Sequence, residues 1–231
     1  MRDRLLDALP QPRLVTDVCR LFMVRHGTTT LNVENRYRGR RDIPLDAQGY
    51  QDAVDAARQL SSAGLSAVYT GPLRRTIATA QIIADEARVP DLRILHGLVN
   101  LDYGAWEGMT AEEAAMYDPE AFRLYRTSPS LAACPHGERL IDAQRRMIEA
   151  LRLIGSRHQG EKVAAVTHAV MIRLVLVKLN GTEDERWRVP VALGSVAEFH
   201  VSGDAAPDGR PGLALRSEGD NRQRGCIAGG A

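Results

Sequence analysis

Short apolar runs alternate with longer amphipathic segments through most of the chain. Residues 21–24 are apolar throughout and lead into Arg-His-Gly, which predicts a buried strand that ends in a loop. Residues 47–63 repeat apolar side chains at helical spacing, with Asp46 as a candidate cap and Gly64 as a stop. The same patterns predict strands at 66–70, 92–95, 162–166, 195–201 and 212–217, and helices at 72–87, from Thr110, at 138–157 and at 169–178.

The alternation of strands with helices favours one fold class. We expect a three-layer α/β/α sandwich with a mainly parallel central sheet. Residues 1–19 are expected to form an N-terminal extension, residues 20–220 a single domain and residues 221–231 a C-terminal tail. The more irregular segment at 100–137 is expected to be an insertion over the active face.

The composition is typical of a globular chain and argues against nucleic acid and anionic membranes as partners. The 231 residues are 44% hydrophobic and 26% charged, and 30 Lys and Arg against 29 Asp and Glu give a net charge of +1. A near-neutral chain of this kind offers no chain-wide basic surface for nucleic acid or anionic membrane. Asp3, Asp7 and Pro10 interrupt the start of the chain, and no run of about 18 apolar residues follows, so we expect neither a signal peptide nor a membrane span.

The cysteines and histidines do not form a metal or disulfide pattern. Cys19, Cys134 and Cys226 are odd in number and widely spaced, and the chain contains no CxxC or HExxH. We therefore expect no disulfide framework, no bound metal and a cytoplasmic location.

Two of the predicted strands end in a histidine. The first leads to Arg25 and His26, the second to His168, and a third strand end leads to Arg74 and Arg75. Because ligands gather at the carboxyl ends of parallel strands, these side chains are expected to meet at one edge of the sheet. A neutral imidazole can attack phosphorus, and arginine offers a fixed fork of donors for phosphoryl oxygens. The residues alone predict an anionic pocket with two histidines.

Six sequence blocks, in order, carry a resemblance to a known family. They are RHGTTTLN, RYRGRRDIPLDAQG, VYTGPLRRTIATAQIIA, LVNLDYGAWEGMT, HGERLIDAQRRM and VTHAVMIR. Over about residues 20–200 this pattern resembles the histidine phosphatase superfamily, also called phosphoglycerate mutase-like, and its phosphatase branch in particular. The resemblance implies the phosphoglycerate mutase-like version of the expected fold.

The resemblance also implies residue roles. His26 would be the nucleophile that becomes phosphohistidine, and Arg25 and Arg75 would bind the phosphoryl oxygens. His168 would stabilise the same group in the transition state, and Asn32 would contact it. These roles suit a reaction that depends on positioning and charge stabilisation.

Asn100 departs from the family pattern. Relatives usually carry Glu or Asp there as the proton donor to the leaving group, and an amide cannot take that role. Three explanations remain open: Asp102 substitutes, with Glu107 a weaker candidate; the substrate has a leaving group that needs little protonation; or the protein is a weakened phosphatase that binds a phosphorylated ligand. Asn100 is then expected to contact substrate.

The arginine-rich loop at residues 35–41 follows the nucleophile in the family pattern. Arg38 stands where relatives often have Gln, and we expect it to bind a second anionic group of the substrate. Gly39 lies beside it and is expected to serve backbone geometry and to belong to the substrate-binding residues. Trp106 is expected to pack beside the pocket, and for Arg146 a solvated position and a supporting one both stay open.

The leading hypothesis is a phosphatase that acts on a phosphomonoester through phospho-His26 and needs no cofactor. The alternatives are a bisphosphoglycerate-dependent phosphoglycerate mutase and a pseudoenzyme that binds a phosphorylated ligand. We expect a small phosphorylated substrate as partner, no nucleic acid and no membrane, and we leave a homodimer open.

Overall fold

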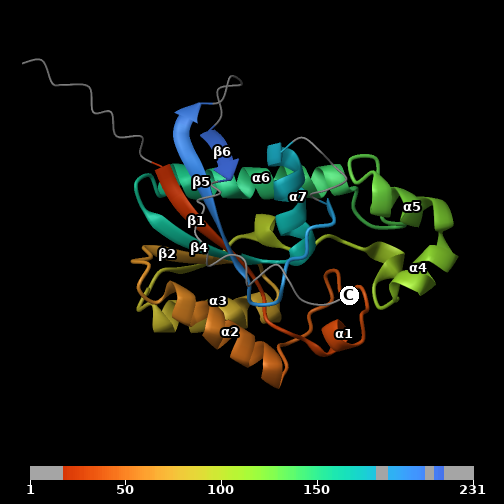
Figure 1. Ribbon diagram of the computed structural model, residues 1–231, viewed down its shortest axis with the longest axis horizontal. Coiled ribbons are helices and arrows are strands. Elements are labelled where there is room, and N and C mark those ends of the chain that lie inside the picture. The colour runs from red at the N-terminus through yellow and green to blue at the C-terminus, as the bar shows by residue number, and fades with distance from the viewer. Residues whose placement is uncertain (1–17, 181–186, 206–210, 216–231) are drawn as a thin grey trace, which may run out of the picture.

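The computed structural model describes residues 18–180, 187–205 and 211–215 (Figure 1). These residues form a six-stranded sheet in the order β3-β2-β4-β1-β5-β6. The strands are β1 (Val18–Arg25), β2 (Ala67–Thr70), β3 (Leu92–Ile94), β4 (Lys162–Thr167), β5 (Val196–Ala205) and β6 (Pro211–Leu215). Strands β3, β2, β4 and β1 are parallel, whereas β5 and β6 pair antiparallel.

Helices cover both faces of the sheet, which confirms the expected three-layer fold (Figure 1). The helices are α1 (Thr30–Val33), α2 (Ala47–Leu60), α3 (Arg74–Glu86), α4 (Ala111–Tyr117), α5 (Pro119–Thr127), α6 (Leu140–Arg157) and α7 (Ala169–Asn180), with 3-10 turns at His96–Leu98 and Gly104–Trp106. Helices α2 and α3 lie on one face, and α6 and α7 lie on the other. Helices α4 and α5 extend beyond one end of the sheet.

The alternation of side chains along β4 builds the two cores. Val163 and Ala165 are buried against α6 and α7, whereas Ala164 and Val166 are buried against α2 and α3. Successive strand residues point to opposite faces, so a run that is apolar at every position is buried on both. This explains the continuous apolar runs at residues 21–24 of β1 and 163–166 of β4.

The helix ends follow the signals in the sequence. Asp46 caps α2, its carboxylate accepting the Gly49 amide at 2.8 Å, as predicted. Thr110 and Glu113 form the predicted capping box at the start of α4. The short α1 and helix α5 were not predicted. Of the expected N-terminal extension, residues 1–17 lie outside the described residues and residues 18 and 19 belong to β1. The whole expected tail, residues 221–231, and the last residues of the expected domain, 216–220, also lie outside the described residues.

Candidate active site

A cavity of about 410 Å³ opens at the carboxyl ends of β1 and β4. The two strands pair in parallel, with Arg25 opposite Thr167, so His26 and His168 follow paired positions. The His26 amide donates to the Thr167 carbonyl at 3.1 Å, which continues the ladder one residue beyond the strand. The lining residues are Arg25, His26, Tyr37, Arg38, Asn100, Tyr103, Tyr125, Arg126, His168, Ala169, Val170, Arg173, Trp187 and Arg188.

His26 is buried and held in one tautomer. Its Nδ1 lies 2.7 Å from the Gly27 carbonyl oxygen. Because a carbonyl oxygen only accepts, Nδ1 carries the proton and Nε2 keeps its lone pair. Gly27 permits this geometry, since a Cβ there would overlap with the Gly49 carbonyl of α2. The residue thus presents the nitrogen that a nucleophile needs.

His168 faces His26 across the floor of the cavity. The two ring centroids lie 5.0 Å apart, with the planes at 63°. His168 is 2% exposed, and neither of its ring nitrogens has a hydrogen-bond partner among the described residues. A buried, unpartnered imidazole is costly unless a ligand satisfies it, so His168 is poised to bind one.

Burial keeps both histidines neutral. It holds the pKa of His26 well below its usual range, and the nearby cations of Arg75 and Arg25 lower that pKa further. The pKa of His168 is lowered by burial and by Arg75 in the same way. Both side chains are therefore uncharged at neutral pH, which is the state in which an imidazole attacks.

Arg25 and Arg75 flank the histidines without a carboxylate partner among the described residues. Arg25 donates to the Val191 carbonyl, whereas Arg75 donates to the carbonyls of Arg41 at 2.7 Å and Gly39 at 2.8 Å. The Nε of each arginine is buried without a partner in the described structure. Burial lowers the pKa of Arg25 to about 9 and that of Arg75 to about 10, so both remain charged at neutral pH.

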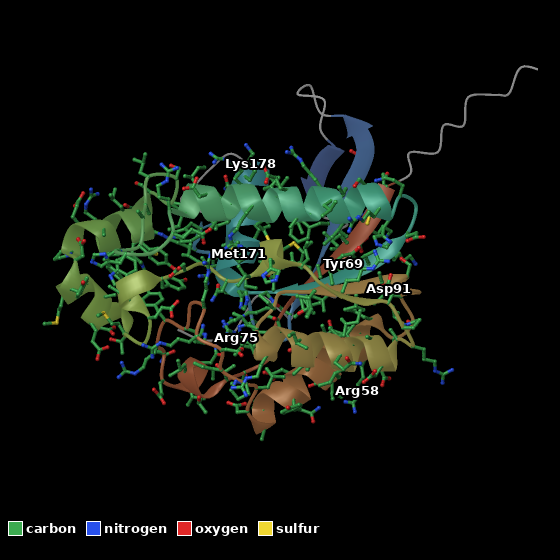
Figure 2. The ribbon with its side chains drawn as sticks, turned by 180° about the vertical axis from the view of Figure 1, so that it is seen from behind. Arg58, Tyr69, Arg75, Asp91, Met171 and Lys178 are labelled. Carbon is green, nitrogen blue, oxygen red and sulfur yellow. The ribbon has the colours of Figure 1, made fainter. Side chains whose placement is uncertain are left out.

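Arg75 affects the histidines without lining the cavity. It does not line the cavity, is fully buried, and lies at the start of α3 (Figure 2). Its hydrogen bonds hold the loop that carries Gly39, and its charge is the strongest cationic influence on both histidines. Arg75 thus contacts the loop beside the cavity, and its contact with substrate stays a prediction.

Arg38 and Gly39 come from the loop after α1. Arg38 lines the cavity, and two carbonyls, those of Leu31 and Arg36, accept from its guanidinium at 3.2 Å. Gly39 does not line the cavity and has a φ of 51°, where a Cβ would also overlap with Glu107. Its contribution is the backbone turn, because its carbonyl accepts from both Arg75 and Asn100.

Asn32 lies away from the cavity. Its Oδ1 accepts from the amide of Thr29 at 3.1 Å and from the Thr29 hydroxyl at 2.8 Å. These bonds brace the start of α1, and Asn32 is not among the lining residues. The structure therefore gives Asn32 a capping contact and does not bring it to the histidines.

Asn100 lines the cavity as a fixed amide. Its Nδ2 donates to the Gly39 carbonyl at 3.0 Å, and its Oδ1 accepts the Leu101 amide at 3.0 Å. Both bonds set the direction of the amide, so it presents no acidic proton to a ligand.

Asp102 and Glu107 lie outside the cavity lining. The Asp102 carboxylate accepts the Gly104 amide at 2.9 Å and pairs with Arg40 at 3.5 Å. Glu107 accepts the Arg40 amide at 2.7 Å. Both candidate proton donors are thus engaged by the basic loop, and the structure does not bring them to His26.

Two groups of lining residues escaped prediction. Tyr37, Tyr103 and Tyr125 form an aromatic wall, in which the Tyr103 and Tyr125 hydroxyls lie 2.9 Å apart. Burial raises the pKa of all three hydroxyls, so they remain protonated. The second group, Arg126, Arg173 and Arg188, adds three cations from α5, α7 and the segment after α7. Tyr103, Tyr125 and Arg126 belong to the segment that was expected to cover the active face.

Trp106 and Arg146 support the site from outside it. Trp106 is fully buried in the core beside Tyr37, as predicted. Arg146 donates to the carbonyls of Val99 at 2.7 Å and Asn100 at 2.9 Å and pairs with Glu138 at 2.8 Å. The alternative of a supporting role therefore holds for Arg146.

The described part of the chain contains few other groups that could bind a metal or react. No group of three His, Cys, Asp or Glu in that part is arranged to hold a metal ion. Cys19 and Cys134 are free and buried, and burial raises the pKa of their thiols to about 11 and about 12, whereas Cys226 lies outside the described residues. Among the described helices, none has the length and apolar character to cross a membrane.

Comparison with known proteins agrees with this arrangement. The model of the histidine phosphatase superfamily (branch 1) matches residues 21–206. The bifunctional protein Rv2228c of Mycobacterium tuberculosis is 35% identical over 188 residues, which is 80% of this chain and 51% of the relative. The chain thus spans about half the length of that relative and of two similar mycobacterial proteins.

Relatives of similar length carry phosphatase and mutase names. Phosphoserine phosphatase 1 of Hydrogenobacter thermophilus is 32% identical over 71% of this chain and 77% of its own. A 2,3-bisphosphoglycerate-dependent phosphoglycerate mutase of Gloeobacter violaceus is 30% identical over 77% of this chain and 86% of its own. The solved structure of YhfR from Bacillus stearothermophilus aligns with a TM-score of 0.74 at 33% identity, covering 87% of this chain and 98% of that one.

Proposed function

Because this chain belongs to the histidine phosphatase superfamily, we propose that it hydrolyses a phosphomonoester through a phosphohistidine intermediate on His26. The observation that carries the proposal is the state of His26: its Nδ1 is tied to the Gly27 carbonyl, its pKa is low, and its Nε2 lone pair is free beside His168. Relatives named as phosphatases support the reaction class.

The proposed reaction has two displacements. The Nε2 lone pair of His26 attacks phosphorus, and the ester P–O bond breaks, with its electron pair leaving on the ester oxygen. Water then attacks the phosphohistidine, the N–P bond breaks, and its electron pair returns to Nε2. The proton that this water loses to solvent balances the proton that the departing ester oxygen takes up. Splitting one difficult displacement into two lowers the barrier of each step.

The cations and His168 stabilise the charge that develops. Arg25 lines the cavity and offers a buried, unpartnered Nε–H to a phosphoryl oxygen. His168, neutral and unpartnered in the described structure, donates a hydrogen bond to the same group. Arg75 holds the loop below and lowers the pKa of His26 from there. Donors that are fixed before the reaction cost no reorganisation when charge appears.

The proposed location is the cytoplasm, since the two described cysteines are free thiols and such thiols persist in reducing compartments. The substrate is expected to be small, because the volume of the cavity is about 410 Å³.

Phosphate release from p-nitrophenyl phosphate tests the proposal. The His26→Ala variant is expected to lose nearly all activity. The matched control is His96→Ala, because His96 is exposed and does not line the cavity. Equal activity in all three proteins would refute the proposal. Incubation with 3-phosphoglycerate separates a phosphatase, which frees phosphate, from a mutase, which forms 2-phosphoglycerate.

A further inference from the structure

Among the residues that the structure describes, no carboxylate lines the cavity. The described lining includes five arginines, two histidines, three tyrosines and Asn100, but neither Asp nor Glu. The nearest candidates from the sequence, Asp102 and Glu107, bind the basic loop instead. A leaving group that departs as a strongly basic alkoxide would therefore find no carboxylic acid among the described lining residues to protonate it.

The arginines that line the cavity differ from the arginines around them in having no carboxylate partner among the described residues. Arg36, Arg40 and Arg41, on the loop beside the cavity, each pair with a described carboxylate. The lining arginines, by contrast, form no ion pair within 4.0 Å among the residues that the structure describes; they are Arg25, Arg38, Arg126, Arg173 and Arg188.

These unpaired cations act on one another. Arg38 and Arg173 both lower the pKa of Arg25, after the larger effect of its burial. Such repulsion is relieved when an anion binds between the charges. A single phosphoryl group beside His26 and Arg25 leaves the cations on α5, α7 and the segment after α7 without an anion.

We propose that the preferred substrate is a phosphoanhydride, whose terminal phosphoryl group is transferred to His26 and whose leaving group is itself a phosphate or phosphate ester. This substrate class accounts for both observations: the absence of a carboxylic acid from the described lining and the presence of arginines without carboxylate partners there. A phosphate leaving group is weakly basic and departs without a proton, and its charge is bound by Arg126, Arg173 and Arg188. The inference rests on the proposed function for its nucleophile, and it replaces the alcohol leaving group of a simple phosphomonoester with a phosphate or phosphate ester.

The atoms and charges balance without a further reactant. The Nε2 lone pair of His26 forms a bond to the terminal phosphorus, and the bridging P–O bond breaks. Its electron pair stays on the bridging oxygen, which becomes an oxygen of the released phosphate. Water then releases the terminal group as inorganic phosphate, and the proton lost by that water goes to solvent.

The test compares leaving groups in one protein. Initial rates are measured with inorganic pyrophosphate and adenosine diphosphate, with p-nitrophenyl phosphate, and with two alkyl monoesters, adenosine monophosphate and glycerol 3-phosphate. We expect kcat/KM for at least one anhydride to exceed kcat/KM for both alkyl esters by about 100-fold or more. This factor corresponds to the contribution of a general acid, which alkyl esters need and the described cavity lining does not provide. If the alkyl esters equal or exceed both anhydrides, the inference is overturned.

Two sets of variants test the missing general acid and the unpaired arginines separately. Asn100→Asp places a carboxyl group in the cavity and is expected to raise the ratio of alkyl to anhydride activity by about tenfold or more. Arg126→Gln and Arg173→Gln are expected to lower kcat/KM for the anhydride by about tenfold each. Arg123→Gln is the control on α5, because Arg123 is exposed and pairs with Glu120. Equal losses for Arg123 and Arg126 variants would count against the inference.

Failure of the inference is distinct from failure of the proposed function. Activity on p-nitrophenyl phosphate that depends on His26, without a preference for anhydrides, overturns only the inference. The absence of any His26-dependent phosphate release overturns both.

Discussion

The rings of His26 and His168 meet edge to face, with centroids 5.0 Å apart, at the ends of two paired parallel strands. Neither imidazole is charged at neutral pH, because burial and the surrounding arginines hold both pKa values well below the usual range. The pair therefore combines a nucleophile with a neutral hydrogen-bond donor. Its properties depend on cations that have no carboxylate partner in the described structure.

The first prediction concerns the acid limb of the pH profile. His26 attacks only when neutral, and its low pKa keeps it neutral below pH 6.5, so the limb of kcat/KM is expected below 6.5. Replacing Arg75 with Met removes the strongest cationic influence, which raises the pKa of His26 and moves the limb to higher pH. The measurement is kcat/KM against pH with p-nitrophenyl phosphate, corrected for substrate ionisation. Arg38→Met provides a second variant, and a limb that neither change moves would contradict the account.

The second prediction concerns stability at acid pH. In the unfolded chain the pKa of His168 returns to about 6.5. Below pH 6.5 the unfolded state then binds the extra proton, so the free energy of unfolding falls as pH falls towards the folded pKa. For each buried histidine the loss reaches about 1.4 kcal/mol per pH unit. Urea unfolding at pH 7.5 and 5.5 should show a smaller loss in His168→Asn than in the parent chain; identical losses would refute the prediction.

The third prediction tests how closely α2 approaches the nucleophile loop. A Cβ on Gly49 would overlap with the backbone of Thr28, two residues after His26. Gly49→Ala is expected to lower the free energy of unfolding by about 1–3 kcal/mol and to reduce kcat, because the loop must move. Gln51→Ala, on the exposed face of the same helix, should change stability by less than about 0.5 kcal/mol. Chemical denaturation and initial rates measure both effects, and a harmless Gly49 variant would be inconsistent with the packing.

The fourth prediction concerns the segment that carries Asn100. Arg146 holds its backbone through the carbonyls of Val99 and Asn100. Arg146→Gln is expected to destabilise the fold by about 2 kcal/mol or more and to lower kcat, since carbonyl and carboxylate partners lose their donor. The neighbouring Arg145 pairs only with Asp142 in the described structure, so Arg145→Gln serves as the control. Similar thermal and kinetic effects of the two variants would argue against a special role for Arg146.

Local patterns in the sequence were sufficient to predict the strands of the sheet and most of the helices, but not α1 and α5. The continuous apolar runs at β1 and β4 predict strands that are buried on both faces, and Asp46 predicts the start of α2. The two histidines could be placed at the same edge of the sheet because both follow strands that the fold class makes parallel. The structure adds that these two strands are paired neighbours. These inferences needed only short-range periodicity and one rule about parallel sheets.

The wall of the cavity could not be predicted in this way. Tyr37, Tyr125 and Arg173 come from three distant segments, and no spacing in the sequence links them. Asp102 was expected near the cavity on the assumption of an extended segment. The chain instead turns at Gly104, whose φ is 53° and whose amide the Asp102 carboxylate accepts. A side chain that satisfies its own turn is directed by local bonds rather than by strand alternation.

The covalent intermediate provides the most direct test of the central claim. The protein is mixed with a ³²P-labelled phosphoryl donor, quenched in alkali within milliseconds and digested, and the labelled peptide is sequenced. The account predicts acid-labile, alkali-stable phosphohistidine on the peptide that contains His26, absent from His26→Ala and retained in the His96→Ala control. Label on another residue, or turnover without label on His26 when the chemical step is rapid, would contradict it.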